Sequence, residues 1–234
     1  MTSRRRGVSD VVSFTLVFAT IIFMIGVVTV TGIGTLGDVQ AGTESNVAEE
    51  TMRNYASTLA DHRTASAPRR STTIKLQGHS LTRSDSLLKW SVSGNPTRIE
   101  NRTGALVRTT DTDTELVYES GALFRAQDGG SVVVRRPPLR CGDQTAHLPV
   151  TRLVGEFSIS SDSRVTLESE LVNQSLTTRE TDSVTVYTDE TARPDSWGET
   201  LTSGGWTGSG PSYTCDSIER VVVHQTTVRI NVIN

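Results

Sequence analysis

The sequence predicts an α+β protein, with one long N-terminal transmembrane helix followed by a mostly antiparallel, β-sandwich-like head domain. Two observations predict this arrangement. No charged side chain occurs from Val11 to Gly37, and about 20 apolar residues are enough for a helix to cross a bilayer. From Ser71 onward, short runs of β-branched residues are separated by turn residues, without helical patterns between them, which is typical of a sandwich or an open barrel.

The basic residues before the apolar run predict its orientation. Arg4, Arg5 and Arg6 precede it, and an excess of Lys and Arg beside a first hydrophobic segment tends to stay in the cytoplasm. We therefore expect a cytoplasmic basic leader over residues 1–7, a transmembrane helix over 8–37 and the rest of the chain outside the cell. The expected location is the cell membrane, crossed once.

Beyond the membrane, residues 38–66 are expected to form an extracellular helical stalk. Ala48, Met52, Tyr55 and Leu59 recur at intervals of three and four residues, which places them in one apolar stripe of a helix. We expect this stripe to contact helices of neighbouring subunits. Pro68 ends the pattern, and the head domain is expected over residues 71–234.

The head domain contains several candidate strands. They are Thr73–Leu76, Leu87–Val92, Leu106–Thr110, Glu115–Tyr118, Leu123–Ala126, Val132–Arg135, Arg164–Val172 and Ser183–Thr188. Between the fifth and sixth of these, Asp128-Gly129-Gly130 supplies the positive φ angles of a hairpin. Near the C-terminus, Val228, Ile230 and Val232 alternate with polar residues, which predicts a final strand with one apolar face.

Cys141 and Cys215 are the only cysteines in the chain. An even number of cysteines in an exported domain favours a disulfide, and two free buried thiols are the alternative. The segment Arg193–Cys215 contains Trp197, Trp206 and several glycines, so it is expected to be a long loop or a hairpin tip. A bridge between the two cysteines would tie the end of that loop to the strands.

The composition argues against several classes of function. The net charge is −3, and the basic stripe that nucleic-acid binding requires is missing. The two cysteines and His62, His79, His147 and His224 lack the spacing of zinc ligands, so no metal is expected. We interpret His224 as a half-buried packing residue of the final strand. No pattern indicates a nucleophile with its base, so we expect no catalytic residue, no cofactor and no enzymatic activity.

Two patterns match known sites by spacing alone. Gly32–Gly37 fits the G-x-G-x-x-G dinucleotide fingerprint, but that site needs a strand before the motif and a helix after it. Here the motif ends an apolar segment, which favours close helix packing or a hinge. Asp111, Asp113 and Glu115 alternate as in a cation loop, but the glycine of a calcium loop does not follow. A solvated strand or turn face is the preferred interpretation.

Several interpretations compete for the N-terminal segment. A secretory signal peptide has an apolar core of roughly 7 to 15 residues before its cleavage site, whereas the run before Val39-Gln40-Ala41 is nearly twice that length. Ser3-Arg4-Arg5 fits a twin-arginine signal, although Gly7 and Val8 follow where a more hydrophobic pair is usual. The simplest alternative is an uncleaved transmembrane anchor.

The segment Arg6-Gly7-Val8-Ser9-Asp10-Val11-Val12 resembles the class III signal peptide of archaeal type IV pilins and pilin-like proteins. The resemblance implies that a prepilin-type peptidase cuts between Gly7 and Val8, and that the remaining helix stays in the membrane as an assembly handle. Haloarchaeal pilins commonly read Val-Ser-Pro-Val-Ile-Gly here. This chain has Asp10 in place of the proline and Ser13 in place of the glycine.

Asp10 has two interpretations. An acidic residue near the end of a membrane helix is costly unless it is paired, so Asp10 is a candidate partner for the new Val8 ammonium of its own or a neighbouring subunit. Equally, Asp10 caps the helix, where the positive end of the helix dipole favours a carboxylate. If the chain stays uncut, Arg6 and Asp10 lie one turn apart and can pair instead.

Two sequons make the chain a candidate glycoprotein. Asn101-Arg102-Thr103 and Asn173-Gln174-Ser175 fit the N-glycosylation pattern, and both lie in the portion expected outside the cell. Asn101 and Asn173 are therefore the candidate acceptors.

Short motifs of the head domain, including Gly121-Ala122-Leu123-Phe124-Arg125 and Leu148-Pro149-Val150, are similar to those of an uncharacterised family of haloarchaeal pilin-like surface proteins. The resemblance implies location and architecture but no activity. We therefore expect a structural or adhesive surface protein, a minor subunit of a type IV pilus-like assembly whose N-terminal helix contacts other pilin-like subunits. The alternative is a non-polymerising, single-pass surface binding or sensor protein.

Overall fold

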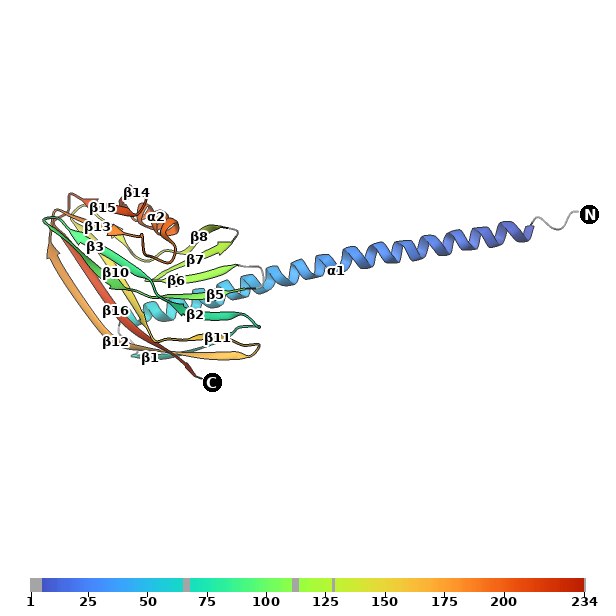
Figure 1. Ribbon diagram of the computed structural model, residues 1–234, viewed down its shortest axis with the longest axis horizontal. Helices are drawn as coiled ribbons and strands as arrows, with labels where there is room; N and C mark the ends of the chain where they lie inside the picture. The colour runs from blue at the N-terminus through green and yellow to red at the C-terminus, as the bar shows by residue number, and fades with distance from the viewer. Residues whose placement is uncertain (1–5, 65–67, 111–113, 128, 234) are drawn as a thin grey trace, which may run out of the picture. The chain divides into compact units, whose positions relative to one another are not determined.

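The computed structural model describes residues 6–64, 68–110, 114–127 and 129–233, except for the side chains of residues 6–10, 30–41 and 95–96. Helix α1 (Arg6–Asp61) is followed by a body built mostly of antiparallel strands (Figure 1). The chain divides into two compact units inside α1, between Glu44 and Ser45. The coarse prediction, an α+β protein with an apolar N-terminal helix and a largely antiparallel β-rich body, is confirmed.

Three sheets make up the described part of the body. The first sheet has the order β1 (Arg69–Lys75), β12 (Arg164–Glu180), β16 (Arg220–Ile233), β10 (Thr145–Val154) and β9 (Arg140–Cys141). The second has the order β11 (Ser158–Ser160), β2 (Ser80–Ser84), β5 (Ala105–Thr109), β6 (Glu115–Glu119), β7 (Ala122–Gln127) and β8 (Gly130–Arg135). The third has the order β14 (Thr207–Ser209), β15 (Ser212–Asp216), β13 (Ser183–Tyr187), β3 (Leu87–Val92) and β4 (Asn95–Arg102).

Among these strands, β10 and β16 form the one parallel pair, and the other pairs are antiparallel. The predicted hairpin is confirmed: Gln127 of β7 pairs with Gly130 of β8, and Gly129 has a φ of 78°. The predicted C-terminal strand is also confirmed as β16, which lies between β12 and β10 in the first sheet.

Two hydrophobic cores lie on opposite faces of the second sheet. The helix core contains Ala48, Met52, Tyr55, Ala56 and Leu59 of α1 together with Ile74, Leu76, Leu81, Leu106, Leu116, Tyr118, Leu123, Leu153, Val165, Leu167, Val228 and Ile230. The tryptophan core includes Trp90, Val117, Phe124, Leu148, Trp197, Trp206 and Val221. Side chains alternate between the faces of a strand, and so Leu116 and Tyr118 enter the helix core while Val117 enters the tryptophan core.

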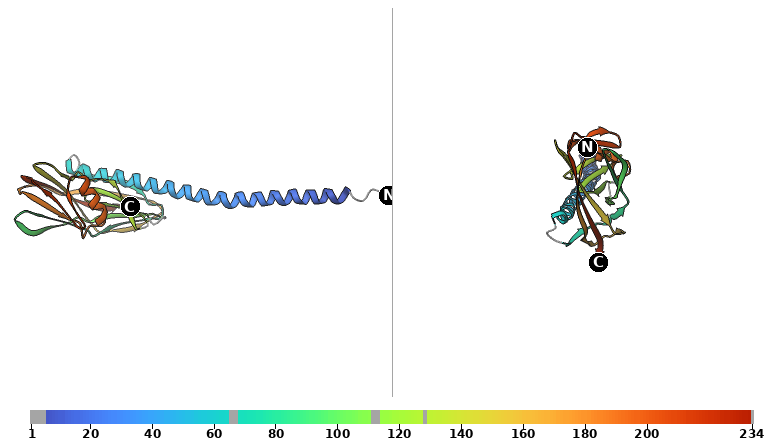
Figure 2. Two further views of the ribbon diagram at one scale, coloured as in Figure 1. Left: turned by 90° about the horizontal axis from the view of Figure 1, so that it is seen from above. Right: turned by 90° about the vertical axis from the view of Figure 1, so that its left-hand side faces the viewer.

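Sequence inspection did not predict helix α2 (Pro194–Ser203), which lies where a long loop was expected. Pro194 occupies the first helical turn, where a proline costs no hydrogen bond, and Asp195 adds a carboxylate that the helix dipole favours. Trp197 and Leu201, four residues apart, are buried in the tryptophan core. Figure 2 shows α2 against the strands, and it contacts β8, β14 and β15. Trp197 and Leu201 therefore anchor a segment whose glycines suggested a loop.

Cys141 and Cys215 form a disulfide, with 5.5 Å between their Cα atoms. Cys141 belongs to β9 and Cys215 to β15. The bridge therefore joins an edge strand of the first sheet to the third sheet, and it closes a long loop, which restricts the unfolded chain.

Candidate functional site

The C-terminal turns of α1 are built into the body. Ala48 is 1% exposed, and Met52, Tyr55 and Leu59 are each fully buried in the helix core. Figure 1 shows these turns running between the first sheet and strands of the second. The prediction that this stripe contacts neighbouring subunits is therefore wrong, because the chain's own sheets cover it. The segment 38–66, expected as a separate stalk, is divided instead, since Ser45 and the residues after it belong to the compact unit of the strands.

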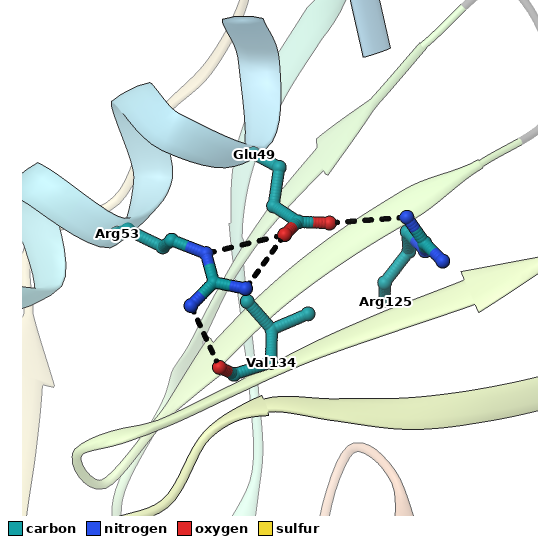
Figure 3. Close-up of polar contacts among 4 residues, drawn as sticks. All are labelled: Glu49, Arg53, Arg125 and Val134. Atoms are coloured by element: carbon teal, nitrogen blue, oxygen red, sulfur yellow. Dashed lines mark hydrogen bonds and ion pairs between the residues drawn. The ribbon is translucent and has the colours of Figure 1, made fainter. Parts of the chain in front are cut away.

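A polar clamp fixes the same turns to the β7–β8 hairpin (Figure 3). The Arg53 guanidinium donates to Glu49 Oε1 at 2.8 and 3.1 Å and to the carbonyl oxygen of Val134 at 3.0 Å. Arg125 Nη1 donates to Glu49 Oε2 at 3.2 Å. The Glu49 side chain is only 17% exposed, so this carboxylate joins two arginines from different elements at the border of the helix core.

The end of α1 has its own attachments to the first sheet. Arg70 of β1 pairs with Asp61 at 3.3 Å, and His62 Nε2 lies 2.9 Å from the hydroxyl oxygen of Ser169 on β12. Gln174 Nε2 donates to the carbonyl oxygen of Arg63 at 2.6 Å. Carbonyls at the end of a helix lack partners within the helix, and this side chain satisfies one just beyond it.

Apolar burial is the larger contribution at this junction. Burying a side chain such as Met or Leu contributes about 1.5–3 kcal/mol, whereas a partly exposed ion pair contributes about 0–1 kcal/mol. Several stripe residues are fully buried, while the arginines of the clamp remain 42–44% exposed. We infer that the stripe supplies most of the stability and that the clamp selects which face of the helix meets the hairpin.

Replacing Glu49 with Gln is expected to lower the stability of the full-length chain by about 1 kcal/mol, because Arg53 and Arg125 lose their shared carboxylate. The loss should shrink as salt is added, since ions screen the pair. Chemical denaturation in a neutral detergent measures both effects. Glu199→Gln is the matched control, because it breaks the exposed Arg136–Glu199 pair at 2.8 Å. Equal losses in the two variants would contradict a clamp.

The N-terminal part of α1 has the opposite environment. The section Val11–Thr29 has a mean hydropathy of 2.7, and none of it is buried in the chain. The hydroxyl groups of Thr15 and Thr20 have partners within the helix, since each donates at 2.8 Å to the carbonyl oxygen four residues earlier. By length and composition this section is able to cross a membrane. The G-x-G-x-x-G pattern also lies inside α1, without the preceding strand that the dinucleotide site needs.

The predicted processing residues lie at the beginning of α1. Gly7, Val8 and Asp10 are in its first turns, and their side chains are outside the described residues. Residues 1–5 of the expected leader are also outside them. The predicted cut and the two interpretations of Asp10 stay predictions.

Glu119 is a second polar centre, which sequence inspection missed. Its carboxylate is fully buried and accepts hydrogen bonds from Trp197 Nε1 at 2.8 Å, the Ala192 amide at 3.0 Å, the Thr103 hydroxyl at 3.2 Å and the Ser86 hydroxyl. Burial raises the pKa of this carboxyl, and the donors oppose that rise. One feature of the sequence does indicate this burial. Side chains alternate between the two faces of a strand, so Glu119 lies on the same face of β6 as buried Val117.

The Glu119 carboxylate joins β6 to three other segments of the body, those of Ser86, Thr103 and Ala192–Trp197. Each oxygen has two donors, so the acceptor positions of the carboxylate are occupied. Elsewhere, Glu115 pairs with Arg193, while Asp111 and Asp113 lie outside the described residues. Within the described residues, no three His, Cys, Asp or Glu side chains come together as possible metal ligands.

The two sequons have different environments. Asn101 on β4 is 7% exposed, and its amide nitrogen is buried, so the folded body has no room for a glycan on that atom. The candidate acceptor Asn101 is therefore corrected to a buried side chain. Asn173 on β12 is exposed, which keeps it compatible with the prediction.

Comparison with known proteins assigns the chain to a protein family. A sequence model for a family of unknown function, DUF7289, matches residues 6–234. This range includes α1 and the strands of the body. No curated protein and no solved structure matches the chain.

Proposed function

This chain belongs to DUF7289, a family of unknown function, and from its own residues we propose that it is a pilin-like, membrane-anchored cell-surface protein. Its role is structural or adhesive, as a minor subunit of a type IV pilus-like assembly. In this proposal α1 crosses the cell membrane once, the basic leader faces the cytoplasm, and the β-rich body faces the outside.

The observation that carries the proposal is the contrast within α1. Residues Ala48 to Leu59 supply a stripe to the helix core, whereas Val11–Thr29 exposes apolar side chains all round the helix. Water does not favour an apolar surface of this kind, which in proteins marks contact with lipid or another chain. The unbroken helix thus combines an anchor with an element of the body core. The arginines before the anchor support the proposed orientation.

The anchor is tested by placing two charges on one face of it. Each arginine near the centre of a membrane helix costs about 2.5–3.5 kcal/mol for insertion, so Ile21→Arg with Ile25→Arg should move most of the protein out of the membrane fraction that resists carbonate extraction. Val132→Arg is the control, because Val132 is 50% exposed on the body. Unchanged membrane retention of the double variant, or a soluble wild-type chain, would contradict the anchor.

Processing and assembly are tested separately from the anchor. Cleavage by a prepilin-type peptidase predicts a mature N-terminus at Val8, and a peptide beginning at Met1 or Thr2 in mass spectrometry would defeat it. Assembly through the exposed part of α1 predicts a ladder of crosslinked subunits on whole cells. A lone monomer supports the second candidate, a non-polymerising surface binding or sensor protein, which is also favoured by the burial of the stripe from Ala48 to Leu59.

A further inference from the structure

A pocket of about 340 Å³ lies on the first sheet, beyond the end of α1. Val222 and His224 of β16, Leu176 of β12, and His147 of β10 line it, together with Arg63 and Arg140. Val222 and His224 lie on the face of β16 opposite to Val221 and Val223, which enter the tryptophan core. Ligand pockets typically measure about 300–1,000 Å³, so this pocket suits a small ligand.

The charges at the pocket have one sign. Within the described residues, no carboxylate lines it, and the guanidinium groups of Arg63 and Arg140 make no hydrogen bond or ion pair. Arg63 is half-buried. A half-buried cation without a counter-charge is unfavourable, and arginine is suited to binding carboxylates through two parallel hydrogen bonds. The two arginines are therefore suited to hold an anion at this pocket.

The histidine of the final strand adds a neutral ring to the pocket lining. Gln174 Nε2 lies 2.6 Å from His224 Nε2 and donates to the Arg63 carbonyl. An amide NH₂ group has only donors, so His224 Nε2 accepts and the ring proton is on Nδ1. Burial, and next the Arg63 charge, lower the pKa of His224, which keeps the ring neutral at neutral pH. The sequence-based interpretation of His224 as a half-buried residue is confirmed, and its position is at a pocket.

Two apolar side chains that line the pocket are at least partly exposed to solvent. Leu176 is 68% exposed, and the partly exposed Val222 lies beside it in the lining. An inorganic anion would leave these side chains in water, and a neutral apolar molecule would leave the arginines without a partner. A ligand that carries both a carboxylate and an apolar body satisfies the two sides together.

We propose that this pocket binds a small organic carboxylate with an apolar body. Arg63 and Arg140 hold the carboxylate, and Leu176 and Val222 contact the apolar body. The inference concerns the β-rich body alone, and it holds or fails independently of membrane anchoring and of subunit assembly.

The first test is a titration of the full-length chain, in a detergent with a neutral head group, with cyclohexanecarboxylate. The ring protons of His147 and His224 should shift in NMR spectra and saturate, while those of His62 and His79, which do not line the pocket, should stay in place. Cyclohexanecarboxamide removes the charge, and acetate and phosphate remove the apolar body. The proposal is overturned if cyclohexanecarboxylate gives no saturable shift. It is also overturned if cyclohexanecarboxamide, acetate or phosphate binds as tightly as cyclohexanecarboxylate.

The second test uses matched arginine variants. Arg63→Gln and Arg140→Gln should each weaken cyclohexanecarboxylate binding at least about tenfold, because a hydrogen bond to a charged group is lost. Arg164→Gln is the control, since Arg164 is exposed on β12 and does not line the pocket. Arg140 is exposed, so its variant tests the site without disturbing the core. Equal binding by Arg140→Gln and the control, or equal weakening in both, overturns the assignment.

Discussion

Replacing Glu119 with Ala is expected to lower the free energy of unfolding by about 3–6 kcal/mol, because the buried Trp197 N–H and the partly buried Ala192 N–H lose this acceptor. The hydroxyls of Ser86 and Thr103, whose oxygens are 3.2 Å apart, can still form a hydrogen bond with each other. For a chain of this size, the melting temperature should fall by about 10 °C or more. Thermal unfolding followed by near-ultraviolet circular dichroism measures the change, with Trp197 as a local reporter.

Glu119→Gln is the matched variant that separates the hydrogen bonds from the charge. Its amide oxygen is able to accept from Ala192 and Trp197, and its NH₂ group is able to donate to the two hydroxyls, which can turn to accept. We therefore expect a stability within about 1 kcal/mol of the wild type near the acid end of the folded range. A loss as large as that of the Ala variant would contradict this account of the cluster.

The pH dependence of the Gln variant follows from the pKa of Glu119. Because burial raises this pKa in the folded state, the protonated carboxyl favours folding. That contribution is complete below the unfolded-state pKa and is lost as the pH rises through the folded-state pKa. The Gln variant lacks this loss, so its stability relative to the wild type should increase with pH. A difference that stays constant across the pH range would show that Glu119 does not titrate with folding.

Replacing Met52 with Ala is expected to destabilise the body by about 2–5 kcal/mol, because a fully buried side chain is removed from the helix core and leaves a cavity. The effect should appear as a lower denaturant midpoint without a change in slope, since the fold is retained. Chemical denaturation of the full-length chain in neutral detergent measures both quantities.

Val47→Ala on the same helix is the control for Met52→Ala. Val47 is 51% exposed, and substitutions at such positions usually change stability by less than about 0.5 kcal/mol. Similar effects of the two variants would mean that the stripe is not a core element. A large effect of Met52→Ala alone would establish that α1 contributes to the body as well as to the proposed anchor.

Local patterns were sufficient for the coarse fold and for several elements. The uncharged run after Asp10 predicted the apolar helix, and alternation predicted β16. Gly129 marked the β7–β8 hairpin. Each of these depends on neighbouring residues along the chain. The stripe from Ala48 to Leu59 was also correctly assigned to a helix, but its partner was not, because an apolar face does not identify which surface covers it.

The polar centres depend on contacts between distant parts of the chain. Glu49 and Arg53 have the spacing of a helical ion pair, yet nothing local indicated Arg125 as their third member. Glu119 is joined to Trp197 from the segment expected as a loop. The pocket likewise combines Arg63 with residues of four strands, β9, β10, β12 and β16. Such sites exist only after the sheets are assembled, so their chemistry is not readable from spacing.

The position of β16 has a consequence for folding. This C-terminal strand separates β12 from β10 in the middle of the first sheet, and its pairing with β10 joins residues 75 positions apart, as in Thr145 with Arg220. The first sheet therefore cannot close until β16 pairs with both of its neighbours. Until then both neighbouring strands present unpaired edges, which attract other chains. Removal of β16 would thus leave the first sheet in two separate parts, β1 with β12 and β10 with β9.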